Sequence, residues 1–208
     1  MCLLFNSFMY SQNADHTSTG FFTKTIEFNR SGSSKKFYNL SSKTDAEKLL
    51  FGDFNAPIEF FYEPCFSGDG IEKIGFRILK DSLEKNYFFE IKFTRKKDIS
   101  FVVSNQFAEK MLKNMYLFIN NFKATVSPIT QNNDGIVNIS MIFDGDSYSF
   151  RTVVGVELWS LKIHSPSGNA QKMADLCLQM INETISNNKF DEKKYIKLLD
   201  DFNFGVAN

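Results

Sequence analysis

Apolar and polar residues alternate along much of the chain, with the period of two that is typical of half-buried β-strands. Runs of this kind, separated by turns rich in Gly, Asn, Asp and Ser, occupy 21–30, 36–41, 58–64, 71–79, 86–94, 99–104, 124–130, 136–143, 147–154 and 156–163. The first residues, MCLLFNSFMYSQNA, are mildly apolar but contain no positive charge. They predict a further strand rather than a signal peptide.

Two longer segments change to a period of three to four residues, which predicts helices with one buried side. The segment 105–121 and the residue that follows it carry apolar positions at Phe107, Met111, Met115, Phe118 and Phe122. The segment 169–186 carries them at Met173, Leu176, Cys177, Met180 and Ile181. We interpret both stripes as core packing.

Two shorter helices are also predicted. Thr44 followed by Glu47 forms a capping-box pattern, and Gly52 stands where a short helix would end. The run DEKKYIKLLDDF predicts a last helix at 191–202.

Three helix starts are similar to one another: AEKLL at 46–50, AEKML at 108–112 and AQKMA at 170–174, each 62 residues after the one before. A strand precedes each of them, and regular repetition indicates a supersecondary unit that needs its neighbours to cover its sheet. We therefore predict an α+β fold of tandem ββββα repeats, with long helices packed on antiparallel sheets in one or two compact domains. The expected units are a partial first unit at 1–56, full units at 57–122 and 123–188, and a C-terminal helix and tail at 189–208.

Composition excludes several classes of protein. Lys and Arg total 24, as do Asp and Glu, so no global charge indicates a nucleic-acid or membrane surface. Three Cys and two His are scattered without the spacing of a zinc site or a disulfide framework, so we expect no metal, no cofactor and an intracellular compartment, whether cytoplasm, nucleus or organelle. No segment approaches the roughly 18 apolar residues of a membrane helix, so no membrane partner is expected.

Two short motifs resemble known nucleic-acid-binding families. Glu59–Pro64 reads EFFYEP, similar to a motif that Whirly proteins carry after their first helix, and Tyr87–Lys92 reads YFFEIK, similar to a strand of Pur repeats. The order of elements across about 36–121 is also Whirly-like. The resemblance implies a tandem ββββα architecture and binding of single-stranded DNA or RNA.

The chain departs from the Whirly pattern at two points. Whirly proteins present a lysine-rich stretch to DNA near the N-terminus, whereas residues 1–20 contain neither Lys nor Arg. A third full unit is also predicted, which Whirly proteins lack and some Pur proteins have.

Local charge agrees with nucleic-acid binding. Between Ile71 and Lys97 eight basic residues accompany four acidic ones. Strand alternation places four of the residues in this segment on one solvent face: Lys73, Arg77, Phe88 and Lys92. The third unit offers fewer equivalents, which are Arg151, Trp159 and Lys162.

We therefore predict a non-catalytic site for single-stranded nucleic acid, in which cations follow the phosphates and aromatic faces stack on bases. The expected phosphate contacts are Arg77, Lys92, Arg95, Lys96 and Lys97, and Phe88 is expected to stack on a base. No helix presents a basic face that could read base edges, so sequence-specific recognition is not implied.

Two other functions remain open. Asp81, Glu90 and Lys92 resemble the D…ExK signature of metal-dependent nucleases, in which two carboxylates hold Mg²⁺; a surface ion pair is the ordinary explanation of that pattern. A protein-interaction or inhibitor module would agree better with the neutral net charge. In each case, exposed sheet edges predict a homo-oligomer.

Overall fold

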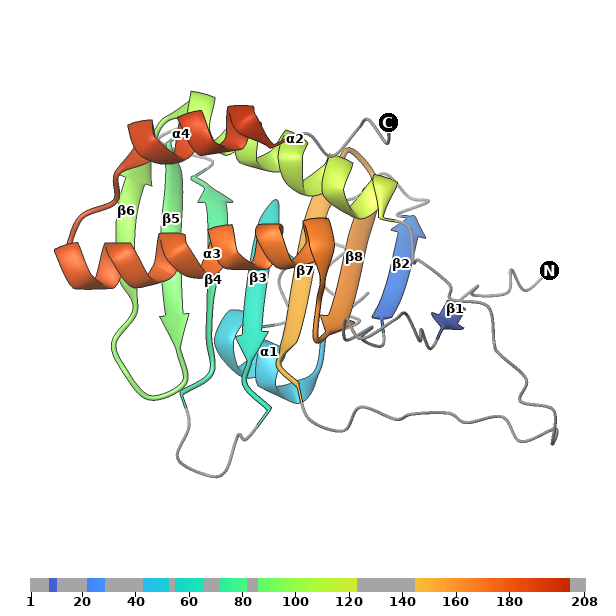
Figure 1. The fold of residues 1–208 in the computed structure, drawn as a ribbon. Coiled ribbons are helices and arrows are strands. Elements are labelled where there is room, and N and C mark those ends of the chain that lie inside the picture. Colours follow the sequence, from blue (N-terminus) through green and yellow to red (C-terminus); the bar gives the residue numbers. More distant parts are fainter. Residues whose placement is uncertain are drawn as a thin grey trace, which may run out of the picture.

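The computed structural model describes residues 8–10, 22–28, 43–52, 55–65, 72–81, 86–122 and 145–202. Within these ranges, seven strands and the three-residue β1 form one antiparallel sheet in the order β1-β2-β8-β7-β3-β4-β5-β6 (Figure 1). The strands are β1 (Phe8–Tyr10), β2 (Phe22–Phe28), β3 (Ile58–Glu63), β4 (Ile74–Lys80), β5 (Tyr87–Phe93), β6 (Ile99–Val103), β7 (Ser147–Val154) and β8 (Glu157–His164).

The described residues also form four helices, which lie on the two faces of this sheet. They are α1 (Asp45–Phe51), α2 (Asn105–Asn121), α3 (Gly168–Asn187) and α4 (Glu192–Asp201). Figure 1 shows α2, α3 and α4 on one face, which we call the long-helix face, and α1 on the other, the α1 face. None of the described helices is both long enough and apolar enough to span a bilayer.

Strand alternation separates an apolar side from a polar side. In β3, Ile58 and Phe60 belong to the main core, together with the stripes of α2 and α3, whereas Phe61 packs against Leu50 and Phe51 of α1. The apolar stripes predicted for both long helices are buried in this way. Each large side chain removed from water contributes about 1.5–3 kcal/mol, so the long-helix face carries most of the stabilisation by apolar burial.

The helix α4 is tied to both long helices. Its residue Glu192 accepts a hydrogen bond from the backbone N–H of Ser104 at 3.0 Å. Lys194 Nζ donates to Glu183 of α3 at 2.6 Å, and the Tyr195 hydroxyl donates to the same carboxylate at 2.8 Å. Hydrogen bonds from Lys194, from Gln179 and from Tyr195 lower the pKa of Glu183 to about 2.

The predicted α+β class is confirmed, and the elements from β3 to α2 agree with the predicted strands and helix to within a few residues. The capping box of α1 is also confirmed: Thr44 Oγ1 accepts from Glu47 N, and Thr44 N donates to Glu47 Oε2 at 2.6 Å. The strands predicted at 36–41, 124–130 and 136–143 lie outside the described residues. The tandem ββββα repeat therefore stays a prediction.

One difference from the expected arrangement concerns the sheets. Instead of separate sheets, the described strands of the three expected units share one sheet, because β3 pairs with β7 and β2 pairs with β8. This pairing removes the free edges that separate sheets would expose at β3 and β8, where unpaired N–H and C=O groups are a liability.

Gly75 of β4 lets α1 approach the sheet closely. A Cβ atom on this residue would lie 2.4 Å from Phe60 O and 2.7 Å from the ring of Phe51. We expect Gly75→Ala to lower the free energy of unfolding by about 1–3 kcal/mol, because the backbone of β3 would have to shift. Urea denaturation measures this change. Ser100→Ala, at an exposed position of β6, is the control and should stay within about 0.5 kcal/mol; equal effects of the two substitutions would contradict the close approach.

Candidate binding face of the sheet

The register of the strands aligns polar residues in one row across the α1 face. Each strand except β1 contributes one residue to this row, and each of these residues lies directly opposite the row residue of the neighbouring strand. In sheet order this polar row is Thr25, Ser160, Arg151, Glu59, Arg77, Glu90 and Ser100. Its four central members alternate in charge, an arrangement in which directly opposed side chains of neighbouring strands attract each other.

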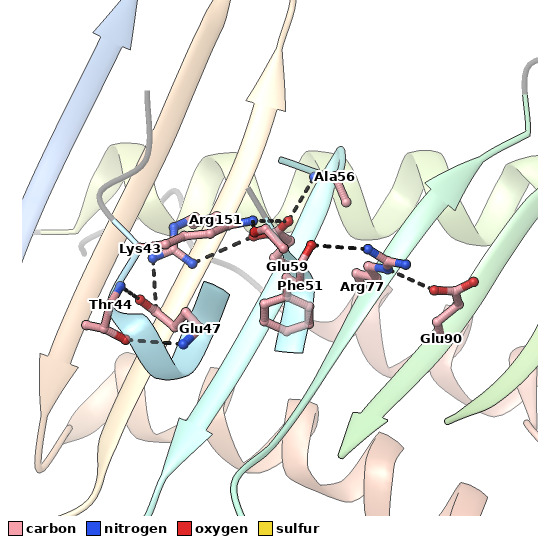
Figure 2. A network of polar contacts seen from close by, with 10 residues as sticks. Lys43, Thr44, Glu47, Phe51, Ala56, Glu59, Arg77, Glu90 and Arg151 are labelled. Carbon is pink, nitrogen blue, oxygen red and sulfur yellow. Dashed lines mark hydrogen bonds and ion pairs between the residues drawn. The ribbon is translucent and has the colours of Figure 1, made fainter. Parts of the chain in front are cut away.

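The left part of the row in Figure 2 joins α1 to the sheet through a buried charge cluster, which consists of Lys43, Glu47, Glu59 and Arg151. Lys43 Nζ lies 2.9 Å from Glu59 Oε1, and Arg151 Nη2 lies 2.9 Å from Glu47 Oε1. The second contact of Arg151, from Nη1 to Glu59 Oε2, is longer at 3.7 Å. All four side chains are buried, and two acids balance two bases, as the burial of charge requires.

Neighbouring charges and hydrogen bonds keep the carboxyl group of Glu47, which α1 contributes to the charge cluster, in its ionised form. Burial raises the pKa of Glu47, but the charge of Arg151 and hydrogen bonds from Ser149 and Thr44 outweigh that effect, so the pKa lies below its usual value. Burial lowers the pKa of Lys43, against the attraction of Glu59. Both of these side chains are therefore stabilised in their ionised form by an oppositely charged member of the cluster.

The three cations that were predicted to share one solvent face, Lys73 just before β4, Arg77 of β4 and Lys92 of β5, do lie on the α1 face, and each has a carboxylate partner. Lys73 Nζ lies 2.5 Å from Glu63 Oε1, and Arg77 Nε lies 2.8 Å from Glu90 Oε2. Lys92 pairs with Asp98. Arg77 also donates to the carbonyl of Phe51, at the end of α1, at 3.4 Å. Their charges are thus compensated within the protein.

The predicted stacking residue Phe88 also lies on the α1 face. It is half-buried, opposite Leu79 of β4 and Val102 of β6. Val102 is 64% exposed. These three residues form a short strip, the apolar strip, on the three strands at that end of the sheet.

The turn between β5 and β6 holds the most accessible cations of the predicted set. Arg95, Lys96 and Lys97 are all exposed, and none forms a salt bridge with any described residue. Glu72 holds the turn in place by accepting from the backbone N–H of Arg95 at 2.9 Å. Lys96 Nζ lies 5.9 Å from the centre of the Phe93 ring.

The three site residues predicted in the third unit differ in burial and in the face of the sheet on which they lie. Lys162 is half-buried on the α1 face, whereas Arg151 is only 4% exposed and belongs to the charge cluster. Trp159 lies on the long-helix face, 8% exposed, with its ring edge-on to Tyr116. Its grouping with Lys162 was wrong, because alternation along β8 puts positions 159 and 162 on opposite faces.

The register of β4 and β5 does not bring the two carboxylates of the nuclease pattern together. Glu90 lies opposite Arg77, and Asp81 comes four residues after Arg77, so roughly 14 Å of strand at about 3.4 Å per residue separates the two carboxylates. Among the described residues, no three His, Cys, Asp or Glu side chains gather closely enough to hold a metal ion.

The buried charge cluster was missed by sequence reasoning, although two signals for it exist. Glu59 interrupts the apolar run IEFF, and Arg151 stands inside the strand SYSFRTVV. A lone charge within a buried strand needs a partner, and the partners lie on distant strands and on α1.

Comparisons with known proteins give no relative. No protein-family model matches the chain, and neither the curated proteins nor the solved structures contain a match.

The two arginines that flank Glu59 in the polar row allow a matched test of burial. We expect Arg151→Met to lower the free energy of unfolding by about 3–5 kcal/mol, because it leaves a buried carboxylate without its partner. Arg77→Met removes a half-buried pair and should cost about 1 kcal/mol or less. Urea denaturation of both variants measures the difference; similar costs would mean that burial of the cluster is incomplete.

Proposed function

We propose that this protein binds single-stranded DNA or RNA without catalysis, and that the turn between β5 and β6 is the main contact for phosphates. The observation that carries the proposal is the accessibility of Arg95, Lys96 and Lys97, three consecutive cations without a described carboxylate partner. Phosphate neutralisation by accessible Lys and Arg supplies most of the sequence-independent affinity of such proteins.

The paired cations have a secondary role in this proposal. A phosphate that approaches Arg77 or Lys92 has to compete with Glu90 or Asp98, which already accept hydrogen bonds from them. The gain in Coulomb energy at these residues is therefore reduced. Contacts at Arg77 and Lys92 should add less to affinity than contacts at the turn.

One aromatic side chain lies beside the turn and a second lies near the other end of β5. Phe93 is half-buried at the end of β5, within cation–π distance of Lys96, and Phe88 is half-buried in the apolar strip. Base stacking on a phenyl ring contributes about 1–3 kcal/mol per base and tolerates any sequence. The proposal therefore predicts a preference for single strands over duplexes, without base-specific readout.

Fluorescence anisotropy with labelled single-stranded DNA and RNA, and with the matching duplexes, tests this function. We expect Lys96→Gln/Lys97→Gln to weaken single-strand binding and to reduce the slope of log affinity against log salt by about 1.4, since each phosphate contact contributes about 0.7. The control is Lys193→Gln/Lys197→Gln, which removes two exposed charges from α4. Absence of binding at about 50 mM salt, or equal losses in both double variants, would contradict the proposal.

A second candidate function is association between protein chains, and the β6 edge favours it. Within the part of the chain that the structure describes, no strand pairs with the outer side of β6. This strand reads ISFVV, without the Lys or Pro that commonly guards a sheet edge. Exposed Val102 adds an apolar contact. Pairing of β6 with β6 of a second copy would extend the sheet and form a homo-oligomer.

Light scattering with size-exclusion chromatography tests this association. We expect the wild-type chain to form a dimer and Val102→Lys to shift it toward the monomer, because a lysine on an edge strand opposes edge-to-edge pairing. Val156→Lys changes an exposed valine in the turn between β7 and β8 and serves as the control. A monomeric wild-type protein at all concentrations would exclude this interface.

A further inference from the structure

A pocket of about 210 Å³ lies on the α1 face beside the buried charge cluster. Its walls come from β2, β7 and β8, and its polar lining consists of Thr25, Ser149, Arg151, Ser160 and Lys162. A water molecule in the liquid has a share of about 30 Å³, so the pocket can hold a group several times larger than one water.

Arg151 gives this pocket its chemistry. The side chain is 4% exposed, and its Nη2 atom is engaged with Glu47. Its Nη1 atom lies 3.7 Å from Glu59 Oε2, and neither Nη1 nor Nε makes a hydrogen bond to any residue that the structure describes. A buried donor without an acceptor costs free energy, about 1–3 kcal/mol and more for a charged group. Of these two donors, Nε is the one that an anion in the pocket can engage without competing with a carboxylate.

Lys162 adds a second cation to the lining. It is half-buried in β8 and forms no salt bridge with any described residue. Hydroxyl groups complete the polar wall: the side-chain oxygens of Thr25 and Ser160 lie 2.6 Å apart. Ser149 of β7 also lines the pocket, but its hydroxyl donates to Glu47. Among the described residues, no acidic side chain contributes to the lining.

We propose that this pocket binds a single phosphate group, held by Arg151 and Lys162 and surrounded by the hydroxyls of Thr25 and Ser160. Two cations and two hydroxyls, contributed by the three strands β2, β7 and β8, match a tetrahedral group with three free oxygens better than a planar carboxylate with two. An arginine fork also suits phosphate oxygens, to which charge-assisted hydrogen bonds are short and strong.

The site is distinct from the turn on which the proposed function rests. The strands β3 and β4 separate β7 from β5, so the pocket and the turn occupy different parts of the sheet. The phosphate can come from a small phosphorylated molecule or from a nucleic-acid strand. Both sources share the same chemistry in the pocket, and the experiment below distinguishes them.

Isothermal titration calorimetry of the full chain with inorganic phosphate, at constant ionic strength against sodium chloride, tests the pocket. We expect saturable binding that weakens about tenfold in Lys162→Gln, the loss of one charge-assisted hydrogen bond. Thr25→Val should weaken it by a smaller factor. Lys172→Gln, which removes an exposed charge from α3 on the opposite face, is the matched control and should bind as the wild type does. Arg151 is left intact because its removal is expected to destabilise the fold.

Two further arms identify the source of the phosphate. Inorganic phosphate that displaces a labelled single strand in the anisotropy assay would assign the pocket to a strand phosphate. Phosphate that binds without displacing the strand, together with binding of a nucleoside monophosphate but not of the nucleoside, would assign it to a small phosphorylated molecule. Absence of saturable phosphate binding, or equal affinity in wild type and Lys162→Gln, would overturn the proposal whatever the result with nucleic acid.

Discussion

The carboxylate of Glu59 connects parts of the fold that are distant in the sequence. Its Oε1 atom accepts hydrogen bonds from Lys43 Nζ and from the backbone N–H of Ala56, both at 2.9 Å, while Arg151 of β7 approaches the other oxygen. A shift of β3 by one residue would carry this charge to the long-helix face, among the aromatic rings of the core. The register of β3 with β7 and β4, and the docking of α1 on the sheet, are thereby tied to one buried charge.

The cations predicted to bind nucleic acid fall into two groups. Those within the strands are compensated by carboxylates, as Lys73, Arg77 and Lys92 show. The exposed cations of the turn after β5 and Lys162 beside the pocket have no such partner among the described residues. Because the whole chain has no net charge, attraction for an anion has to arise where local compensation is incomplete.

Short-range sequence patterns predicted most of the described helices and strands, but they did not predict the partners of the candidate binding residues. The capping box of α1 and the two faces of β4 and β5 depend on neighbouring residues, so the sequence contains enough to predict them. The pairing of β3 with β7 depends on residues about ninety positions apart, and no local pattern specifies it. The charge excess counted between 71 and 97 was misleading for a similar reason: Glu63 and Asp98, which neutralise Lys73 and Lys92, lie just outside that window. Trp159, in contrast, was misplaced although alternation along β8 already assigned its face.

The position of α1 argues against one continuous binding surface across the sheet. Phe51 packs onto Gly75 of β4, and in the register Gly75 stands level with Lys92 of β5, Phe61 of β3 and Ser149 of β7. A nucleic-acid strand that followed this level from the turn toward Lys162 would meet the end of α1 on its way. Removing α1 would expose Glu47, Glu59 and Arg151 to water and break the charge cluster, which opposes any such movement. The turn after β5 and the pocket beside Lys162 are thus better described as two separate proposed anion sites, with the buried cluster and α1 as the barrier between them.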